Sequence, residues 1–296
     1  MIIQTHLGGR VIFRNGAVIL TSAGRVPPGW SAARYSVVSP GTELRRLAAT
    51  ASGNDHAAGY MTVTGSPSGD QQLAPVPHGA AAWPDDHRAL PVAHATRPEH
   101  VAVARFQLMA ALGLGRWASH CRADVPVVVV GGGPVAVGCV LELKRLGVAS
   151  VVTVTRHPQP AAADLPGVTV VTDPPGASTR PVVIDCTGRS AQALALVAPG
   201  GLIGLLGTPD DEAELSSAAV HRSGAAVAGM HELAGHSDDS RRALFQTVLR
   251  WVTATVDADA APGWFTTIPG DQAGPFYAAL AGAKRPTTPF VILQWS

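Results

Sequence analysis

Apolar residues between positions 125 and 208 recur in a repeating order of strand, turn and helix. Residues 125–130 form a continuous run of mainly valine, which is typical of a strand buried on both faces. The same pattern predicts strands at 150–155, 168–171, 181–186, 201–207 and 225–229, and helices at 134–146, 189–198 and 238–252. This alternation predicts an α/β fold with a doubly wound parallel sheet.

The two ends of the chain carry a different pattern. Residues 1–118 hold short alternating segments between Pro and Gly turns, which is typical of antiparallel strands. The last segments are predicted as a strand at 264–269, a helix at 271–282 and a strand at 289–295. We therefore expect a β-rich domain built from residues 1–118 and 263–296, and a separate α/β domain at 119–262.

The helix predicted at 238–252 has a recognisable beginning. Ser237 and the two aspartates that follow it suit a helix N-terminus, because a serine caps backbone amides and acidic groups match the helix dipole. Leu244, Val248 and Trp251 recur at helical spacing, so we expect them to form its buried face.

A glycine motif follows the first valine strand directly. Gly131, Gly133 and Ala136 fit G-x-G-x-x-G/A, and Pro134 and Val135 open the predicted helix. This spacing gives a tight turn and lets backbone amides at a helix N-terminus approach a pyrophosphate. Strand, motif, helix and second strand occur in the order of a Rossmann dinucleotide-binding domain, although a glycine-rich turn without a ligand would look similar.

The end of the second strand favours one dinucleotide over the other. NAD sites usually place an acid there for the ribose 2′-hydroxyl, whereas NADP sites offer an arginine to the 2′-phosphate. Here the acidic position holds Thr155 and the next residue is Arg156. NADPH is therefore predicted in preference to NADH, unless Arg156 is only a solvated loop residue.

Composition excludes several classes of protein. The 296 residues include 22 Lys and Arg against 21 Asp and Glu, and no basic run that would follow a nucleic-acid backbone. No apolar run reaches the roughly 18 residues of a membrane span, and the N-terminus does not look like a signal peptide, so a cytoplasmic protein is expected. Cys121, Cys139 and Cys186 fit no disulfide or zinc spacing and are expected to be reduced and inert.

Several segments together resemble the medium-chain dehydrogenase/reductase superfamily, the relatives of zinc alcohol dehydrogenase. The resemblance is strong over 125–209, in "VVVVGGGPVAVG", "VVIDCTG" and "APGGLIGLLGTP", and patchy over 44–118. "YSVVSPGTEL" and "NDHAAGYMTV" are similar to segments that carry zinc ligands in that family. The resemblance implies a GroES-like substrate domain beside the Rossmann domain, and further cofactor contacts at Thr187, Gly188, Gly207 and Thr208.

The chain departs from this family at the catalytic metal. The positions of the three zinc ligands fall on Pro40, Asp55 and a residue near Phe106, which leave at most one oxygen donor. A catalytic zinc site needs three protein ligands and an open position. The cluster of four cysteines that holds the structural zinc of the family is also missing. The resemblance therefore implies a shortened member without zinc.

Without a Lewis acid, a side chain must supply the proton or stabilise the developing oxyanion. Thr42 matches the hydroxyl residue that relays protons in the zinc enzymes, and Asp55 and His56 lie where metal ligands would converge. We therefore predict Thr42, Asp55 and His56 as catalytic residues. Alternatively, Thr42 only caps a helix that starts at Glu43, and the other two belong to a solvated loop. Other groups noted near these segments are the hydroxyls of Tyr35 and Tyr60, and Arg45, Arg46 and Arg105 as anchors for a charged substrate.

The sequence thus predicts a zinc-independent, NADPH-dependent oxidoreductase. It would transfer hydride to a carbonyl, an imine or an activated C=C bond of a small biosynthetic substrate, or oxidise an alcohol in the reverse direction. The alternative is an NADP(H)-binding sensor or scaffold without turnover. A homodimer is expected by resemblance, through the edge of the nucleotide-domain sheet at 201–207. "HELAGH" at 231–236 is not a metalloprotease helix, because its histidines are five residues apart instead of four.

Overall fold

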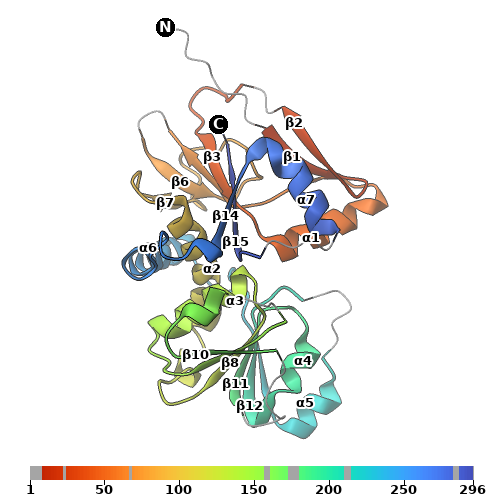
Figure 1. The fold of residues 1–296 in the computed structure, drawn as a ribbon, viewed down its shortest axis with the longest axis vertical. Helices are drawn as coiled ribbons and strands as arrows, with labels where there is room; N and C mark the ends of the chain where they lie inside the picture. Colours follow the sequence, from red (N-terminus) through yellow and green to blue (C-terminus); the bar gives the residue numbers. More distant parts are fainter. Residues whose placement is uncertain are drawn as a thin grey trace. The chain divides into compact units, whose positions relative to one another are not determined.

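The computed structural model divides the chain into two compact units, which we describe separately (Figure 1). The first unit comprises residues 1–102 and 257–296, and the second comprises 103–256. The sequence placed these boundaries at 118/119 and 262/263. The residues that the structure describes are 9–22, 25–66, 69–156, 161–172, 180–209, 215–282 and 287–295.

A parallel six-stranded sheet forms the centre of the second unit. Its strand order is β10-β9-β8-β11-β12-β13, so the chain starts in the middle, builds outward on one side and then returns to build the other. The strands are β8 (Val127–Val130), β9 (Val151–Val154), β10 (Val168–Val171), β11 (Arg180–Asp185), β12 (Val197–Leu205) and β13 (Ala226–Gly229). This is the strand order of a dinucleotide-binding Rossmann sheet, as predicted.

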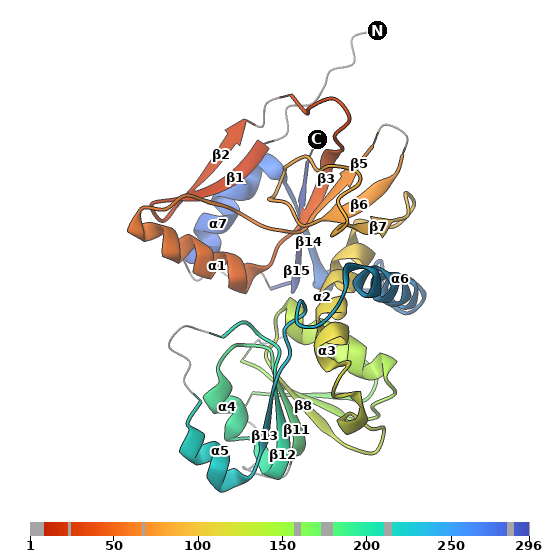
Figure 2. The same cartoon turned by 180° about the vertical axis from the view of Figure 1, so that it is seen from behind.

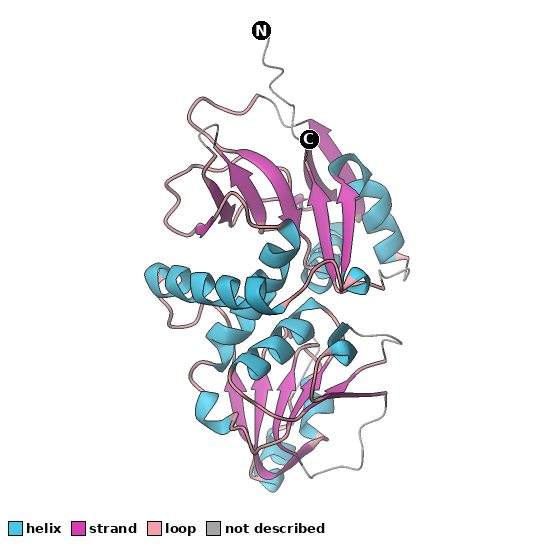
Figure 3. Cartoon of the chain, turned by 60° about the vertical axis from the view of Figure 1, so that its left-hand side comes forward, coloured by secondary structure: helices cyan, strands magenta, loops and turns pink. Residues whose placement is uncertain are grey.

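The sheet is covered on both faces, as Figure 3 shows. Val127 and Val129 of β8 pack with α3 (Pro134–Arg145) in one apolar cluster. Val128 and Val130 point to the other face and pack in a second cluster beside α4 (Ser190–Leu194). A run of consecutive valines is needed here because alternate side chains of one strand enter two different cores.

The edge of this sheet is not where the sequence placed it. β12 lies between β11 and β13, so the segment 201–207 has a hydrogen-bonded strand on each side. β13 is the outer strand instead. The helix predicted at 189–198 is also shorter, because β12 already begins at Val197. The additional helix α5 (Ser217–Ser223) precedes β13.

Helix α6 (Asp238–Thr255) begins as predicted, because the Ser237 side chain accepts a hydrogen bond from the Ser240 amide at 3.2 Å. Of the three residues predicted for its buried face, Val248 is buried and the other two are not. Leu244 and Trp251 are only half-buried. The fully buried positions are Phe245, Val248, Leu249 and Val252. The buried face is thus rotated by one position from the predicted one. Both sets of positions have helical spacing, so spacing alone does not show which of them is buried.

Helix α2 (Pro98–Leu114) lies within the region that the sequence indicated as β-rich. It is apolar on nearly all sides, and Val101–Ala104 are each fully buried. A helix buried all round has no polar face, and therefore no helical periodicity to recognise. The boundary between the two units falls inside this helix, after Ala102.

The first unit holds two β-sheets. One has three antiparallel strands in the order β2-β1-β4, and the other has six in the order β14-β15-β3-β5-β6-β7. The strands are β1 (Gly9–Arg14), β2 (Ala17–Ser22), β3 (Ala32–Val37), β4 (His56–Ala57), β5 (Thr62–Gly65), β6 (Gln71–Ala74), β7 (Leu90–Val92), β14 (Phe265–Pro269) and β15 (Phe290–Gln294). Short 3-10 turns complete the two units: η1 (Thr50–Ser52), η2 (Ala118–His120), η3 (Ala161–Asp164), η4 (Pro262–Trp264) and η5 (Gly270–Gln272).

The end of the chain belongs to the first unit. β14, α7 (Ala273–Ala281) and β15 follow in the expected order, and β15 pairs with β3. Figure 2 shows α7 beside α1 (Pro40–Ala49), and their apolar residues share one core. α1 begins at Pro40 rather than at Glu43, with Ser39 as its N-cap, so Thr42 lies inside the first turn and is not the cap.

No helix in the described parts of the chain combines the length and the hydropathy that a membrane span requires.

Close packing of α3 on α2 gives the first testable prediction. A Cβ at Gly138 would lie 2.5 Å from the Phe106 carbonyl carbon and 2.6 Å from its oxygen, and both are backbone atoms. Ala normally stabilises a helix by about 1 kcal/mol over Gly. Here we expect Gly138→Ala to destabilise the protein by about 1–3 kcal/mol, because overpacking outweighs propensity. Urea denaturation of both proteins measures the difference.

Gly229→Ala is the matched control, because a Cβ at Gly229 meets nothing within 4 Å. The control should keep the wild-type midpoint. A Gly138→Ala midpoint equal to or above that of the wild type would contradict the packing argument.

Candidate functional site

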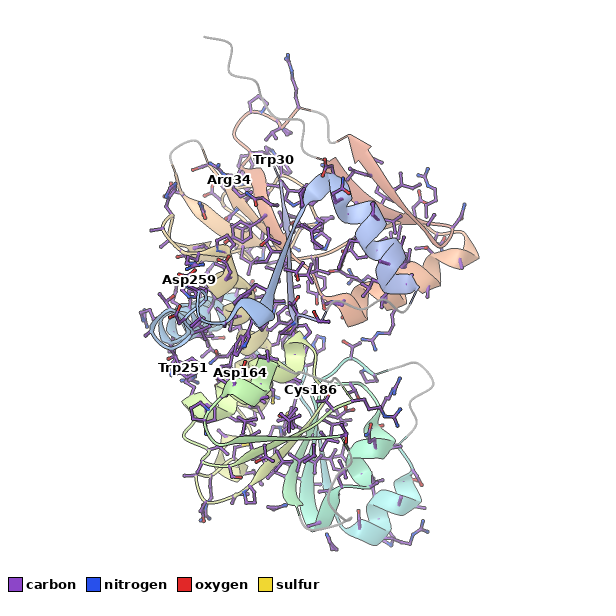
Figure 4. The ribbon with its side chains drawn as sticks, viewed as in Figure 1. Trp30, Arg34, Asp164, Cys186, Trp251 and Asp259 are labelled. Carbon is purple, nitrogen blue, oxygen red and sulfur yellow. The ribbon has the colours of Figure 1, made fainter. Side chains whose placement is uncertain are left out.

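The carboxyl ends of β8 and β11 form the topological switch point of the parallel sheet. β8 begins the sheet, β9 and β11 flank it, and the register sets Val130 level with Val154 and Asp185. Loops that leave neighbouring strands in opposite directions open a crevice at such a point, and ligands of α/β sheets bind there. Figure 4 labels Cys186, the first residue after β11, at this edge of the sheet.

Gly131 begins the loop after β8 in a conformation that only glycine adopts readily, with φ at +129°. A Cβ at this position would lie 3.2 Å from the Thr187 methyl group and 3.5 Å from the Cys186 Cβ. The glycine therefore lets the loop after β8 lie directly against the loop after β11.

Gly133 is the N-cap of α3, and it meets the requirements of an anion site. A Cβ there would meet nothing within 4 Å, so no described atom crowds the side of Gly133 on which a side chain would project. No side chain caps the helix, and Pro134 has no amide to offer. The amides of Val135 and Ala136 are in the first turn, where no intrahelical acceptor exists. An open, uncapped helix N-terminus of this kind suits a pyrophosphate.

A buried carboxylate holds the loop after β11. The Asp185 side chain accepts hydrogen bonds from the Thr187 amide and the Thr187 hydroxyl, both at 2.7 Å. Gly188 has φ at +79°, and a Cβ there would lie 2.1 Å from the Thr208 carbonyl oxygen. A Cβ at Gly207 would similarly lie 2.5 Å from the Cys186 carbonyl carbon. Thr187, Gly188, Gly207 and Thr208 are thus brought together beside the glycine loop.

The loop after β9 lies on the other side of the glycine loop. Thr155 is buried, and its amide donates to the Val171 carbonyl at 2.9 Å. Arg156 follows and is exposed. All eleven residues that the sequence assigned to the cofactor therefore lie in the loops that follow β8, β9, β11 and β12, or in the first turn of α3.

The three cysteines are free thiols. Burial raises the pKa of Cys121 to about 12, with a further contribution from Cys139. Burial, followed by the contact with Cys139, raises the pKa of Cys186 well above its usual value. Thiols with raised pKa values carry little thiolate at neutral pH, so Cys121 and Cys186 are poor nucleophiles.

The predicted catalytic residues lie in the first unit, on two separate segments. Thr42 is half-buried in the first turn of α1, with its Oγ1 3.4 Å from the Ser39 hydroxyl. His56 is exposed in β4. Asp55 is exposed and paired with Arg14, whose Nε lies 2.9 Å from Oδ1. That hydrogen bond is the main reason why the pKa of Asp55 lies below its usual range. Among the described residues, no hydrogen bond joins Thr42 to the other two.

The positions that correspond to zinc ligands carry no suitable set of donors. Pro40 is the first residue of α1, and Phe106 is fully buried in α2. Asp55 has the only carboxylate of the three, and Arg14 holds it. Across the parts of the chain that the structure describes, no group of three His, Cys, Asp or Glu side chains is placed to hold a metal.

Two of the suggested substrate anchors are engaged elsewhere. Arg105 forms a two-pronged ion pair with Glu232, with distances of 2.7 and 2.8 Å. Burial is the largest single influence on the pKa of Glu232 and raises it, but the charge and hydrogen bonds of Arg105, together with the charges of Arg241 and His231, hold that pKa below its usual range. The guanidinium of Arg46 lies 5.2 Å from the centre of the Tyr60 ring. The segment 231–236 is a turn after β13, as predicted, and not a helix.

The sequence missed one polar cluster in the first unit. Glu43, His78 and Tyr277 are each fully buried, and the side chains of His78 and Tyr277 both bond to Glu43 Oε2. Tyr35 is also buried, which raises the pKa of its hydroxyl. The cluster joins residues 35 and 234 positions apart, so no local spacing could indicate it.

Comparisons with known proteins identify the fold. No protein-family model and no curated protein sequence matches the chain. Solved dehydrogenases and reductases match it over nearly their whole length. L-idonate 5-dehydrogenase from Escherichia coli K-12 is 12% identical, with a TM-score of 0.73, and the match covers 97% of this chain and 98% of that one.

Two further matches were solved with a nicotinamide cofactor. Acetophenone reductase from Geotrichum candidum, in complex with NAD, is 13% identical over 98% of this chain and 97% of its own, with a TM-score of 0.72. TarJ from S. aureus, in complex with NADPH, is 11% identical over 98% and 99%, with a TM-score of 0.67. The chain thus has the two-part fold of the zinc alcohol dehydrogenase-like proteins, with a parallel Rossmann sheet and a β-rich unit.

Proposed function

We propose that this protein is a zinc-independent oxidoreductase that uses NADPH. It would reduce a carbonyl, an imine or an activated C=C bond of a small molecule, or oxidise the corresponding alcohol. The observation that carries the proposal is the open N-terminus of α3 at Gly133, because a pyrophosphate would fill the space that this glycine leaves. The likeness to proteins solved with NAD and NADPH supports the same class of ligand.

Arg156 supports the phosphorylated form of the cofactor. It is exposed directly after β9, in the loop beside the glycine loop, and no carboxylate occupies the position before it. An arginine can donate paired hydrogen bonds to a phosphate, whereas a ribose 2′-hydroxyl is usually held by an acid. The proposal therefore assigns Arg156 to the 2′-phosphate.

Reduction requires a hydride and a proton. When bound, the reduced nicotinamide supplies the hydride. Thr42 is our first choice among the predicted proton donors, because the residue is half-buried in the first turn of a helix. Asp55 and His56 remain weaker proposals, since both are exposed and Arg14 already holds Asp55. Zinc independence rests on the chemistry of the residues at positions 40, 55 and 106.

The second candidate function is a nucleotide-binding protein without turnover. It is supported by the ion pair between Asp55 and Arg14. Asp55 has the one carboxylate among the predicted catalytic residues, and that carboxylate is already paired. Such a protein would keep the cofactor site at Gly131 and Gly133 and would need no proton donor. The two functions differ in one measurable property, which is oxidation of bound NADPH by a second substrate.

Stopped-flow fluorescence of bound NADPH, mixed with a panel of ketones, enones and imines, tests the first function. We expect oxidation with at least one member, and we expect Thr42→Val to slow that reaction by about 100-fold or more, the usual contribution of a general acid. His56→Gln and Asp55→Asn compare the other two residues. No oxidation with any member of a broad panel would favour the binding protein.

The cofactor assignment has its own test. Arg156→Ala should weaken NADPH binding by about 1.5–3 kcal/mol, roughly 10-fold to 100-fold in Kd, and leave NADH binding unchanged. Fluorescence titration measures both affinities. Arg122→Ala removes an exposed arginine that pairs with Asp124 in the same unit, and serves as the control. If Arg156→Ala leaves the ratio of the two affinities unaltered, the assignment to the 2′-phosphate is wrong.

A homodimer remains a proposal, but the surface that would form it changes from β12 to β13. β13 is an edge strand without Lys, Arg or Pro, and its Val227 is 37% exposed. An apolar edge without such protection is suited to pairing with a second copy. Val227→Lys should therefore convert a dimer to a monomer in sedimentation-velocity experiments, with Leu233→Lys, in the turn after β13, as the control. A variant that stays dimeric would exclude this edge.

A further inference from the structure

Three buried side chains from distant parts of the first unit meet around one carboxylate. Glu43 comes from α1, His78 from the turn at 77–80 and Tyr277 from α7, and each is 0% exposed. His78 Nε2 lies 3.1 Å from Glu43 Oε2, and the Tyr277 hydroxyl donates to the same oxygen. The other oxygen, Oε1, accepts from the Ser39 amide at 2.9 Å.

The hydrogen bonds define how the protons are arranged. His78 Nδ1 is buried and has no partner among the described residues. A carboxylate oxygen only accepts, so the hydrogen bond to Glu43 requires a proton on Nε2, and a second proton on Nδ1 would be an unsatisfied buried donor. The arrangement that fits is a neutral His78 with its proton on Nε2. Glu43 then accepts three hydrogen bonds, from Ser39, His78 and Tyr277.

A buried carboxylate contributes little net stability to a core, because removing its charge from water costs free energy. Apolar residues of similar volume at positions 43 and 277 would avoid the cost of desolvating the charge, and such replacements are often neutral or stabilising. What the carboxylate provides in addition is geometry. It ties α1 to two other segments at a single point, and it does so within the first turn of the helix.

Both partners of Glu43 are themselves immobilised. Gly59 packs on the His78 ring so closely that a Cβ would lie 2.4 Å from two of its atoms. The His78 amide donates to the Ala58 carbonyl at 2.9 Å. The Tyr277 ring packs edge-on against Phe13, with 5.2 Å between the ring centres. Glu43 is therefore held from two directions by closely packed groups.

The first turn of α1 depends on this carboxylate more than on ordinary capping. Ser39 is the N-cap, but its hydroxyl makes no capping hydrogen bond to a backbone amide of the helix. The hydroxyl lies 3.4 Å from Thr42 Oγ1 instead, while Glu43 binds the Ser39 backbone amide. Glu43 thus fixes the residue that contacts the Thr42 hydroxyl.

We propose that Glu43 is a positioning residue for Thr42, and that His78 and Tyr277 hold it in place. The Glu43 carboxylate locks Ser39 and the first turn of α1, and so sets the direction of the Thr42 hydroxyl. The part of this inference that concerns catalysis rests on the proposed function, because it takes Thr42 to be the proton donor. The structural part concerns only the geometry of the turn.

Tyr277→Phe tests the proposal with the smallest change, because it removes one hydroxyl and keeps the ring. The Ser39 amide is the reporter, and its hydrogen exchange is measured by NMR. We expect the Ser39 amide to exchange at least 10-fold faster in Tyr277→Phe and in Glu43→Ala than in the wild type. Glu43→Gln retains an acceptor oxygen, so exchange in this variant should be slower than in Glu43→Ala. Where a substrate is turned over, kcat should fall about 10-fold to 100-fold, as expected for a displaced reacting group, with the Kd for NADPH unchanged.

Ser36→Ala is the matched control. Ser36 is also fully buried in the first unit, and it bonds to Thr62 and Trp295 at 2.8 Å. This variant should lose stability in urea but keep the wild-type exchange of the Ser39 amide and the wild-type kcat.

The outcomes separate this proposal from the proposed function. Unchanged Ser39 exchange in Tyr277→Phe and Glu43→Ala overturns the positioning role, whether or not the protein is an enzyme. Faster exchange with an unchanged kcat, or an equal loss of kcat in Ser36→Ala, also overturns it. Absence of turnover with every substrate defeats the proposed function alone, and the Ser39 amide then still decides whether Glu43 fixes the turn.

Discussion

The second unit depends on the parallel register of its three central strands, β8, β9 and β11. Val130, Val154 and Asp185 end β8, β9 and β11 at the same level, so the three loops that follow begin side by side. Each loop must then turn in very little space. Gly131 makes this possible at the end of β8, because its φ of +129° favours glycine and a Cβ there would lie only 3.2 Å from the Thr187 methyl group. The register therefore brings the proposed cofactor residues together, and the glycine lets the loop after β8 lie against the loop after β11.

The first unit contains a buried carboxylate, that of Glu43. Its core is mostly apolar, yet a carboxylate lies at the centre of the contact between α1 and α7. Three hydrogen bonds compensate for the loss of water around that carboxylate, and they come from three separate segments of the chain. Two of these hydrogen bonds connect the first turn of α1 to segments that are distant in the chain.

The sequence predicted the strands and helices of the second unit well, because the patterns that indicate them are local. A valine run, a glycine motif and a helix start at Ser237 each depend on residues close together in the chain, and the structure confirms them. α2 was missed because a helix buried on all sides has no polar face. The cluster of Glu43, His78 and Tyr277 was missed for another reason, since its members meet only after folding. The edge strand was assigned wrongly because pairing order is not written in any one strand.

The insertion of one unit into the other determines the order in which the chain can fold during synthesis. Residues 103–256 form the second unit without interruption, so its sheet and both of its apolar clusters can form before residues 257–296 are synthesised. The β-rich unit has no such freedom. β15 lies between β14 and β3, and Tyr277, Val291 and Leu293 belong to its core. Strands β3, β5, β6 and β7 are therefore synthesised before β15, and until β15 pairs with β3 their sheet lacks its two C-terminal strands.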